Sequence, residues 1–294
     1  MIRWGIIGCG DIVRKRVARA IRQDGHSQLI AACRRDRAKL LDFCQTYQVE
    51  RVFDRDADLL KDPEVDAVYI ATPVRYHAPQ TIAAAEAGKH VLVEKPMARS
   101  AAECELMIDA CRQRGVRLGV AYYRRFYPVA ARIKELLANE TLGQLISVSA
   151  TTTSSFGIGV QEHDEGFWRV VRADSGGGAL MDIGSHRIDL LLDLCGPAEV
   201  RTALMTTGAN WDTEDCATVV LRFQSGVHGV LQCVFCTRAK ADELRIVGSK
   251  GKLAADPLND GRRPVSASAN SVWPLPCTPA MPNTSPARTE NEAP

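Results

Sequence analysis

Over its first 121 residues the chain alternates short apolar runs with amphipathic helical patterns, and this alternation limits the fold more than any other feature. Apolar runs that are each followed by a helical period are typical of parallel strands joined by crossover helices. The expected strands cover residues 2–7, 29–33, 65–71, 90–93 and 117–121, and the expected helices cover 11–22, 38–47, 79–87 and 101–114. The pattern predicts an α/β domain over residues 1–121, with a parallel sheet covered on both faces.

The pattern changes from residue 122 onward. A helix is expected over 128–139, and a glycine run at 176–178 opens a second helix that closes at Gly196-Pro197. Strands are expected over 145–153, 199–206, 216–223, 227–235 and 243–247, with hairpin signals at the turns 224–226 and 248–251. Residues 122–255 are therefore expected to form an α+β domain in which helices cover one face of a mainly antiparallel open sheet.

From residue 256 onward the periodicity stops, and prolines fall among serine, asparagine and threonine. Such a stretch cannot bury enough apolar surface to offset the entropy lost on ordering. Residues 256–294 are therefore expected to form a disordered or loosely packed tail.

Composition and charge exclude several classes of partner. The 294 residues carry a formal net charge of +2, so nucleic acid and anionic membranes are not expected as partners. No apolar run approaches the roughly 20 residues that a membrane helix needs, and the first strand leaves no room for a signal peptide. Most of the 10 cysteines lie singly in strand or helix patterns, which predicts reduced, buried thiols and a cytoplasmic location. Cys233 and Cys236 form a CxxC pair without a second pair, so no metal site is predicted.

A glycine turn follows the first expected strand and opens the first expected helix. Its residues are Gly8, Cys9, Gly10, Asp11 and Ile12. This context is the one that a Rossmann dinucleotide-binding fingerprint requires: the first glycine permits the tight turn, and the second lets a pyrophosphate approach the free amides of the helix. Valine replaces the third glycine, which governs packing of the helix on the strand. The turn predicts a bound dinucleotide.

The end of the second strand bears on the choice between NAD and NADP. Arg34 stands where an acidic residue would bind the ribose 2′-hydroxyl of NAD, and Arg35 and Arg37 lie next to it. A guanidinium suits the 2′-phosphate of NADP, so NADP is the favoured cofactor. Two alternatives stay open: a solvated basic turn, and a site in which Asp36 serves NAD.

Lys95 follows the strand 90–93, between Glu94 and Pro96. The carboxyl end of a parallel strand is where ligands of open α/β sheets bind. The residue before a proline is driven away from helical conformation, so the backbone of Lys95 is restricted and is not part of a flexible loop. The alternative is an ordinary surface lysine at the start of a loop.

Asp182 and His186 follow the glycine run, four residues apart on one face of the expected helix. Asp189 and Asp193 continue this face. By themselves these residues allow a solvated polar stripe or a zinc site without a visible third ligand.

Together these motifs resemble the glucose-fructose oxidoreductase/inositol dehydrogenase (Gfo/Idh/MocA) family over residues 1–255. The resemblance is carried by the Gly8 turn, by the segment from Ala71 through Thr72 and Pro73 to His77, by the segment 87–96, and by the glycine run with Asp182 and His186. It implies that Lys95 and Asp182 orient the substrate hydroxyls and that His186 takes the hydroxyl proton. Lys95 itself, or a relay from Lys95 to His186, is an open alternative.

The resemblance extends to the surrounding residues. It implies cofactor contacts from Thr72, Pro73, His77, Glu94, Lys95 and Pro96, and a substrate pocket that includes Tyr123, Arg124, Trp168 and Arg169. The chain departs from the family at Tyr123, where many members carry asparagine, and in the proline-rich tail, where members usually continue with further sheet and a helix.

The expected activity is hydride transfer between a nicotinamide cofactor and a sugar, polyol or related cyclic alcohol or carbonyl, with its direction open. The rival interpretation is a non-catalytic sensor that binds NAD(P) or sugar on the same fold. A zinc alcohol dehydrogenase lacks a ligand set. An exposed apolar sheet face is costly in water, so a homo-dimer or homo-tetramer is expected.

Overall fold

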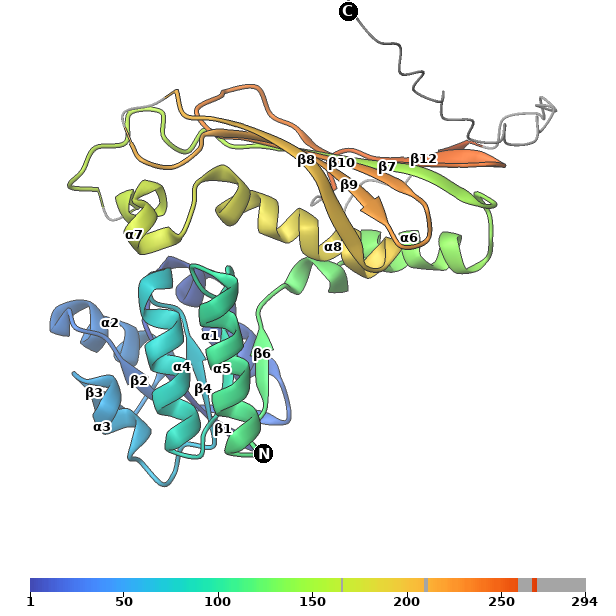
Figure 1. Cartoon of the computed structure of the whole chain (residues 1–294). Helices are drawn as coiled ribbons and strands as arrows, with labels where there is room; N and C mark the ends of the chain where they lie inside the picture. Colours follow the sequence, from blue (N-terminus) through green and yellow to red (C-terminus); the bar gives the residue numbers. More distant parts are fainter. Residues whose placement is uncertain (165, 209–210, 259–265, 269–294) are drawn as a thin grey trace, which may run out of the picture.

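The computed structural model describes residues 1–164, 166–208, 211–258 and 266–268. The chain forms two lobes, each built around one sheet, and β6 leads out of the first lobe into the second (Figure 1). The predicted fold class is confirmed: a parallel α/β lobe precedes an α+β lobe with a mainly antiparallel sheet. Most of the predicted tail lies outside the described residues.

The first lobe contains a sheet of six parallel strands in the order β3-β2-β1-β4-β5-β6. Helices α4 and α5 lie side by side against it (Figure 1). The strands are β1 (Ile2–Ile7), β2 (Ser27–Cys33), β3 (Arg51–Phe53), β4 (Ala67–Ile70), β5 (His90–Val93) and β6 (Leu118–Val120). The helices are η1 (Val13–Val17), α1 (Ala18–Gln23), α2 (Arg37–Tyr47), α3 (Asp56–Leu60), η2 (Val74–Tyr76), α4 (His77–Glu86) and α5 (Ala101–Gln113).

Local sequence explains where these helices begin and end. The hydroxyl of Ser100 accepts a hydrogen bond from the backbone N–H of Glu103 at 3.2 Å, which caps the first turn of α5. Asp36 caps α2 in the same way through the N–H of Lys39 at 3.1 Å. Helix α4 ends as predicted at Gly88, whose φ of 73° is the left-handed conformation that favours glycine.

Two short elements of the first lobe were not predicted. Strand β3 and helix α3 lie between residues 48 and 64, where three- and five-residue elements give too short a pattern to detect. The helix predicted over 11–22 includes the π-helical stretch η1, and Val13 in this stretch is fully buried.

The second lobe contains a sheet of seven strands in the order β13-β12-β11-β7-β10-β9-β8. Helices α6 and α8 lie along one face of it (Figure 1). The strands are β7 (Leu145–Thr153), β8 (Ala198–Thr206), β9 (Cys216–Phe223), β10 (His228–Val234), β11 (Asp242–Gly248), β12 (Gly251–Ala255) and β13 (Ser266–Ser268). The helices are η3 (Tyr123–Phe126), α6 (Pro128–Ala138), η4 (Phe167–Val170), α7 (Arg172–Ser175), η5 (Leu180–Gly184) and α8 (Ser185–Cys195).

Both predicted hairpin turns are confirmed, because β9 pairs with β10 and β11 pairs with β12 in antiparallel fashion. One other pair of strands was not expected. Strands β7 and β10 run parallel, although every other neighbouring pair in the sheet is antiparallel. The two strands are separated by more than seventy residues, so no turn signal in the sequence reveals that they are neighbours. Strands β12 and β13 were not predicted either, and β13 lies in the segment expected to be an irregular tail.

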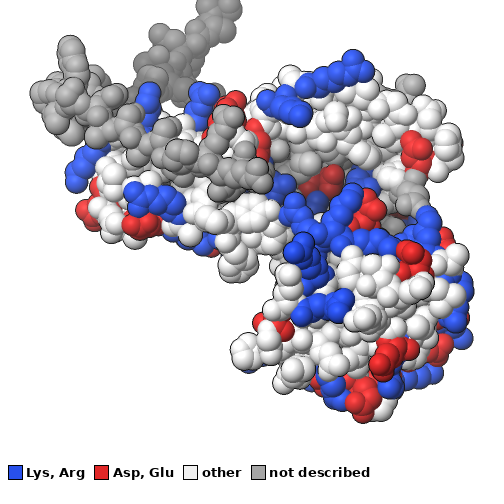
Figure 2. All heavy atoms as spheres, turned by 180° about the vertical axis from the view of Figure 1, so that it is seen from behind, with Lys and Arg blue, Asp and Glu red and all other residues white. Residues whose placement is uncertain are grey.

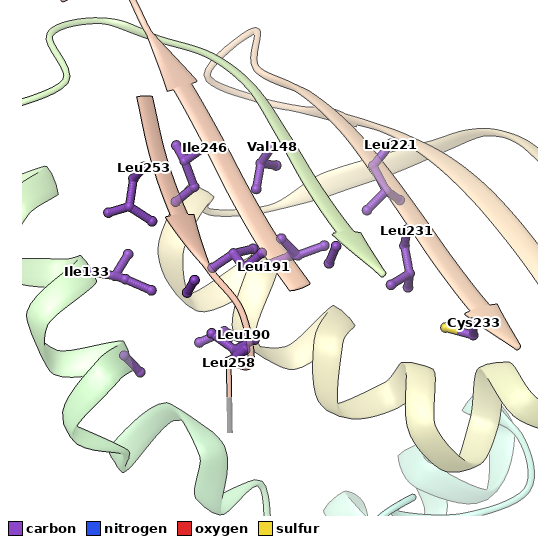
Figure 3. Packing of buried hydrophobic residues seen from close by; sticks show 14 of the residues in the cluster. Ile133, Val148, Leu190, Leu191, Leu221, Leu231, Cys233, Ile246, Leu253 and Leu258 are labelled. Atoms are coloured by element: carbon purple, nitrogen blue, oxygen red, sulfur yellow. The ribbon is translucent and has the colours of Figure 1, made fainter. Parts of the chain in front are cut away.

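The core of the second lobe lies between its sheet and its helices. Leu190 and Leu191 of α8 belong to one buried cluster with Val148, Leu231 and Ile246 of the sheet (Figure 3). These five side chains are at most 2 % exposed. Burying an aliphatic side chain contributes about 1.5–3 kcal/mol, so this contact fixes the position of α8 and of the residues at its start.

The two lobes are joined by polar contacts around the glycine run. Nη1 of Arg75 donates to Oδ1 of Asp174 at 2.5 Å, and Nη1 of Arg99 donates to the carbonyl oxygen of Ala173 at 2.8 Å. Gly176 has φ of 82°, and a Cβ there would lie 2.5 Å from the carbonyl oxygen of Arg99. Glycine is therefore required at this position because the second lobe approaches the backbone of the first so closely.

Candidate active site

The glycine turn contains two glycines with different physical requirements. Gly8 has φ of 96°, and a Cβ there would lie 2.6 Å from the carbonyl oxygen of Ala71, so the fold itself requires this glycine. A Cβ at Gly10 would meet no atom within 4 Å. The space next to Gly10 therefore lies outside the protein's own packing, on the side from which a pyrophosphate would approach the helix. Cys9, between the two glycines, is fully buried.

The basic residues after β2 have separate partners. Arg34 donates a hydrogen bond from Nη1 to the carbonyl oxygen of Cys9 at 2.7 Å, which brings its guanidinium next to the glycine turn. The guanidinium carbon of Arg35 lies 5.5 Å from the centre of the Tyr76 ring. Arg37 pairs with Asp54 at 2.8 Å. Within the described residues, Arg34 and Arg35 have no carboxylate partner, whereas Asp36 is engaged in capping α2.

The segment after β4 is fixed from beneath by a buried histidine. His77 is 1 % exposed, and its ring nitrogens lie 3.0 Å from the carbonyl oxygen of Pro96 and 2.9 Å from that of Thr72. Burial lowers its pKa. His77 thus connects the Thr72-Pro73 turn to the turn after β5, and its ring nitrogens face backbone carbonyls. Any effect on a cofactor would act through these two turns.

Glu94 is buried within the first lobe. The hydroxyl of Tyr69 donates to Oε1 of Glu94 at 2.6 Å, and the backbone N–H of Lys95 donates to Oε2 at 3.1 Å. Burial, followed by the charge of Glu94, raises the pKa of Tyr69. The Glu94 carboxylate therefore holds the backbone of Lys95 in place.

Lys95 and Asp182 meet between the two lobes. Nζ of Lys95 donates to Oδ1 of Asp182 at 2.8 Å and to its backbone oxygen at 2.9 Å. Their side chains are 18 % and 22 % exposed, so the pair is largely shielded from water. Burial alone would raise the pKa of Asp182, but the charge and hydrogen bond of Lys95 together with the charges of Arg169 and Arg124 outweigh it, and the net shift is downward. Asp182 is thus held as a carboxylate beside an ammonium.

His186 is 3 % exposed, and its Nδ1 is buried without a hydrogen-bond partner. The rings of Tyr122 and Tyr123 approach it edge-on, with centroid distances of 5.9 and 5.3 Å. Burial lowers the pKa of His186, and the charges of Lys95 and Arg124 lower it further. The imidazole is therefore neutral near neutral pH, the state in which one ring nitrogen carries a free lone pair.

The polar face of the helix is not the solvated stripe that the sequence left open. Asp189 and Asp193 are 10 % and 17 % exposed, and both are paired with cations. Asp189 accepts two hydrogen bonds from Arg125, one of them at 3.0 Å. Asp193 lies 2.7 Å from Nζ of Lys134 and 3.5 Å from Nη1 of Arg125. These ion pairs join α8 to η3 and α6.

The residues predicted for the substrate pocket lie on two sides of Asp182 and His186. Arg169 stacks on Trp168, with its guanidinium carbon 4.6 Å from the ring centre, and its Nε lies 4.0 Å from Oδ2 of Asp182. Tyr123 lies beside His186, and the guanidinium carbon of Arg16 is 5.0 Å from its ring centre. Arg124 is half-buried, and its Nε has no hydrogen-bond partner.

Two cavities adjoin this region. A small one of about 10 Å³ lies between the lobes and is lined by Pro96, Trp168, Arg169 and Asp182, among others. The larger one, about 490 Å³, lies on the face of the first sheet next to α1 and is lined by apolar and tyrosine side chains. It includes Tyr123 and Glu94 but neither Lys95, Asp182 nor His186. The size of a cavity therefore does not mark the polar cluster, because the larger cavity is not lined by any of its three residues.

Sequence reasoning missed Arg187, which directly follows His186. It is 1 % exposed and donates from Nη2 to Asp242 of β11. Burial lowers its pKa to about 9. The only signal in the sequence was an arginine inside an otherwise apolar helical pattern, which indicates a buried charge only once the neighbours of the helix are known.

Two features are absent from the described residues. Within them, no helix combines the length and the apolar character that crossing a membrane requires. In the same part of the chain, no group of three or more histidine, cysteine or acidic side chains is placed to hold a metal ion.

Comparisons with known protein families match both lobes. Residues 2–122 match the model described as "Oxidoreductase family, NAD-binding Rossmann fold". Residues 130–254 match the model of the GFO/IDH/MocA C-terminal domain. Among curated proteins, the 1,5-anhydro-D-fructose reductase of Ensifer adhaerens is 30 % identical over 256 residues, which cover 86 % of this chain and 75 % of the reductase.

Solved structures of similar fold include proteins with either nicotinamide cofactor. The WlbA dehydrogenase of Bordetella pertussis, in complex with NADH and UDP-GlcNAcA, has a TM-score of 0.83 at 28 % identity and covers 93 % of this chain and 78 % of its own. KijD10, a 3-ketoreductase of Actinomadura kijaniata in complex with NADP and TDP-benzene, has a TM-score of 0.78 at 26 % identity, covering 87 % of this chain and 77 % of its own.

Proposed function

The chain belongs to the Gfo/Idh/MocA family of oxidoreductases, and on that premise we propose that Lys95, Asp182 and His186 form the site at which it moves hydride between a nicotinamide cofactor and a sugar or polyol. The observation that carries this proposal is the contact of Lys95 with Asp182 across the two lobes, beside a buried imidazole. The first lobe supplies the dinucleotide turn and Lys95, and the second lobe supplies Asp182 and His186.

The residues of the glycine turn fit a dinucleotide. The free space at Gly10 and the start of the helix at Asp11 would accept the pyrophosphate. Arg34 stands next to the turn and Arg35 lies over the ring of Tyr76, both without carboxylate partners in the described structure, and they would hold a 2′-phosphate. Asp36 is engaged in capping α2. This arrangement favours NADP over NAD, whereas the similar structures include both cofactors.

Each residue of the polar cluster has one role in the proposed reaction. When bound, the nicotinamide accepts or donates the hydride. The ammonium of Lys95 would donate a hydrogen bond to the reacting oxygen and stabilise its developing negative charge. Asp182 orients this ammonium through the hydrogen bond at 2.8 Å. His186, neutral and with a free Nδ1, would take the hydroxyl proton during oxidation and return it during reduction.

The remaining residues shape the pocket. Trp168 and Arg169 line the small cavity next to Asp182, and Tyr123 packs against His186. Ring surfaces beside polar groups suit a sugar, which has an apolar face and hydroxyl edges. The name of the Ensifer relative, a reductase of an anhydro sugar, supports the same substrate class.

The test is a turnover screen with both cofactors. Purified protein is titrated with NADPH and NADH by fluorescence, and polyols and keto-sugars are then screened through the absorbance of the reduced cofactor. We expect tighter binding of NADPH and turnover of at least one compound. Lys95→Ala should abolish turnover while it leaves NADPH binding within a few-fold of the native value. Cofactor binding without any Lys95-dependent turnover would refute the proposal that the protein is an enzyme.

The choice of cofactor has its own variant. Arg34→Asp should replace the guanidinium that suits a 2′-phosphate with a carboxylate that binds a ribose 2′-hydroxyl. We expect the ratio of NADP to NAD affinity to fall by about tenfold or more, the size of a lost charge-assisted contact. Arg37→Asp, at a position paired with Asp54, is the matched control. An unchanged ratio in Arg34→Asp would reject the preference for NADP.

The non-catalytic sensor finds no support in the comparisons, because each protein named above is a dehydrogenase or reductase by its own name. The enzyme interpretation needs no further assumption, since all three polar groups of the cluster are present and shielded from bulk water.

We also propose that the protein forms a homo-oligomer through the sheet of the second lobe. Large apolar side chains of this sheet remain exposed, including Val200 at 64 %, Leu204 at 71 % and Met205 at 55 %. Exposed apolar side chains gathered on one edge are typical of an interface. Light scattering should give a mass of two or four chains, and a purely monomeric mass would reject this proposal.

A further inference from the structure

Two arginine side chains next to the proposed site keep nitrogen atoms that have no partner in the described structure. Nε and Nη1 of Arg187, and Nε of Arg124, are buried without a hydrogen bond. Buried polar atoms are nearly always hydrogen-bonded in proteins. Three unpaired donors on two positively charged side chains therefore indicate that an acceptor belongs between or beside them.

These guanidiniums and His186 share one region. His186 and Arg187 are consecutive at the start of α8, and Arg124 lies in η3, which contacts α8. The charge of Arg124 contributes to the lowered pKa of both His186 and Arg187. Arg124 is half-buried and open to solvent on one side, whereas Arg187 lies deeper at 1 % exposure.

The carboxylates of this region are already paired. Asp182 binds Lys95 at 2.8 Å, Asp189 binds Arg125, and Asp242 binds Nη2 of Arg187. In the described part of the chain, Arg124 has no ion pair at all. The region therefore has more positive than negative charge, and lysine and arginine side chains gather in the hollow where the lobes meet (Figure 2).

Water alone is a poor explanation of this arrangement. A water molecule can accept the unpaired N–H groups, but it does not offset the charge of Arg124, which has no ion pair in the described structure, in a region of low dielectric constant. A carboxylate or a phosphate does both, because its oxygens match the planar donor pattern of a guanidinium.

We propose that Arg124 and Arg187 bind an anionic group of the substrate, so that the preferred substrate is an acidic sugar or polyol rather than a neutral one. This inference rests on the proposed function, because it names the substrate class of the same site. The anionic group lies next to His186 and directs the reacting hydroxyl toward it. Carboxylate and phosphate share this chemistry and are separated by the choice of probe.

The test measures binding and turnover separately. Protein saturated with NADP⁺ is titrated by calorimetry with D-glucose, D-glucuronate and D-glucose 6-phosphate, and kcat/KM is measured for the same three compounds. Because saturating NADP⁺ occupies the proposed 2′-phosphate site at Arg34, D-glucose 6-phosphate cannot bind there. We expect one of the two anions to bind at least about tenfold more tightly than D-glucose, the factor that one charge-assisted contact supplies.

Two variants and one control identify the residues. Arg124→Gln and Arg187→Met should each reduce the preference for the anion to about a fifth of its native value or less. Arg201→Gln removes a positive charge at an arginine whose side chain is 57 % exposed and distant from the site, and it should leave the preference unchanged. Arg124 is half-buried, so Arg124→Gln keeps the test decisive if Arg187→Met does not fold.

The outcomes separate this inference from the proposed function. Equal or tighter binding of D-glucose, or no detectable binding of either anion, overturns the acidic substrate class, and Lys95-dependent turnover of any neutral polyol then leaves the oxidoreductase intact. Binding of an anion that depends on Arg124, without Lys95-dependent turnover of any compound, supports the anion site and counts against the catalytic proposal.

Discussion

The proposed cofactor side and the proposed substrate side of this protein are built by different means. On the cofactor side, backbone shape is decisive: Gly8 allows the turn, Gly10 leaves space, and His77 holds two neighbouring turns from beneath. On the substrate side, buried charged side chains from both lobes pair with one another, as Lys95 does with Asp182. A site made of backbone tolerates changes of its neighbours, whereas a site made of buried ion pairs fails when one partner is removed.

The largest difference should appear on the substrate side. Asp182→Asn removes the carboxylate that orients the ammonium of Lys95, so kcat should fall by about a hundredfold or more, as is typical when a positioned catalytic group is disturbed. NADPH affinity, measured by fluorescence, should stay within a few-fold of native. Asp109→Asn removes an exposed partner of Arg112 and serves as control. Equal loss of cofactor binding and turnover would show that the two sides are not separate.

Substitution of each of the two glycines of the turn tests the cofactor side of this comparison. Gly8→Ala places a Cβ 2.6 Å from a backbone oxygen at a φ of 96°, so unfolding free energy should fall by about 1–3 kcal/mol or more. Gly10→Ala meets no atom within 4 Å and should leave the melting temperature nearly unchanged. It should still weaken NADPH binding by about tenfold, or ~1.4 kcal/mol. Native cofactor affinity in Gly10→Ala would contradict the assigned pyrophosphate position.

Acid should affect both sides through their buried histidines. Burial lowers the pKa of His77 and of His186, so below pH 6.5 the unfolded chain binds protons that the folded chain does not. Stability is therefore present above this pH and is lost as pH falls, by at most about 1.4 kcal/mol per pH unit for each histidine. Urea unfolding between pH 7 and 5 measures the slope. His186→Asn should reduce this slope by the contribution of about one proton, and an unchanged slope would contradict a neutral buried imidazole.

The smallest effect is expected at a surface ion pair of the first lobe. Arg3 binds Asp66 at 2.7 Å, and its hydrogen bond lowers the pKa of Asp66 to about 2. The stabilisation is present above the unfolded pKa and is lost as pH falls from about 4 to about 2. Both side chains are about a third exposed, so Asp66→Asn should cost no more than about 1 kcal/mol at pH 7. If Asp66→Asn lost as much unfolding free energy as the loss of one partner of a buried ion pair, exposure would not determine how much an ion pair contributes to stability.

Features that depend on neighbouring residues in the chain, such as helix ends, could be predicted from local sequence. Gly88 ends α4 where the sequence placed its C-cap, and the helices that Asp36 and Ser100 cap begin within one residue of the expected starts at 38 and 101. The short β3 and α3 carry too few residues to show a period, and the parallel pair of β7 and β10 depends on neighbours far away in the chain.

By itself the sequence determined the parallel lobe, the dinucleotide turn and the identity of the polar side chains, because each depends on residues that are close together in the chain. Only the tertiary structure decided that Lys95 contacts Asp182, that Asp189 is buried in an ion pair, and that Arg187 lies unsatisfied beside His186. The physical reason is that burial and pairing of charges are properties of the space between the lobes. No periodicity or spacing records which distant segments enclose that space.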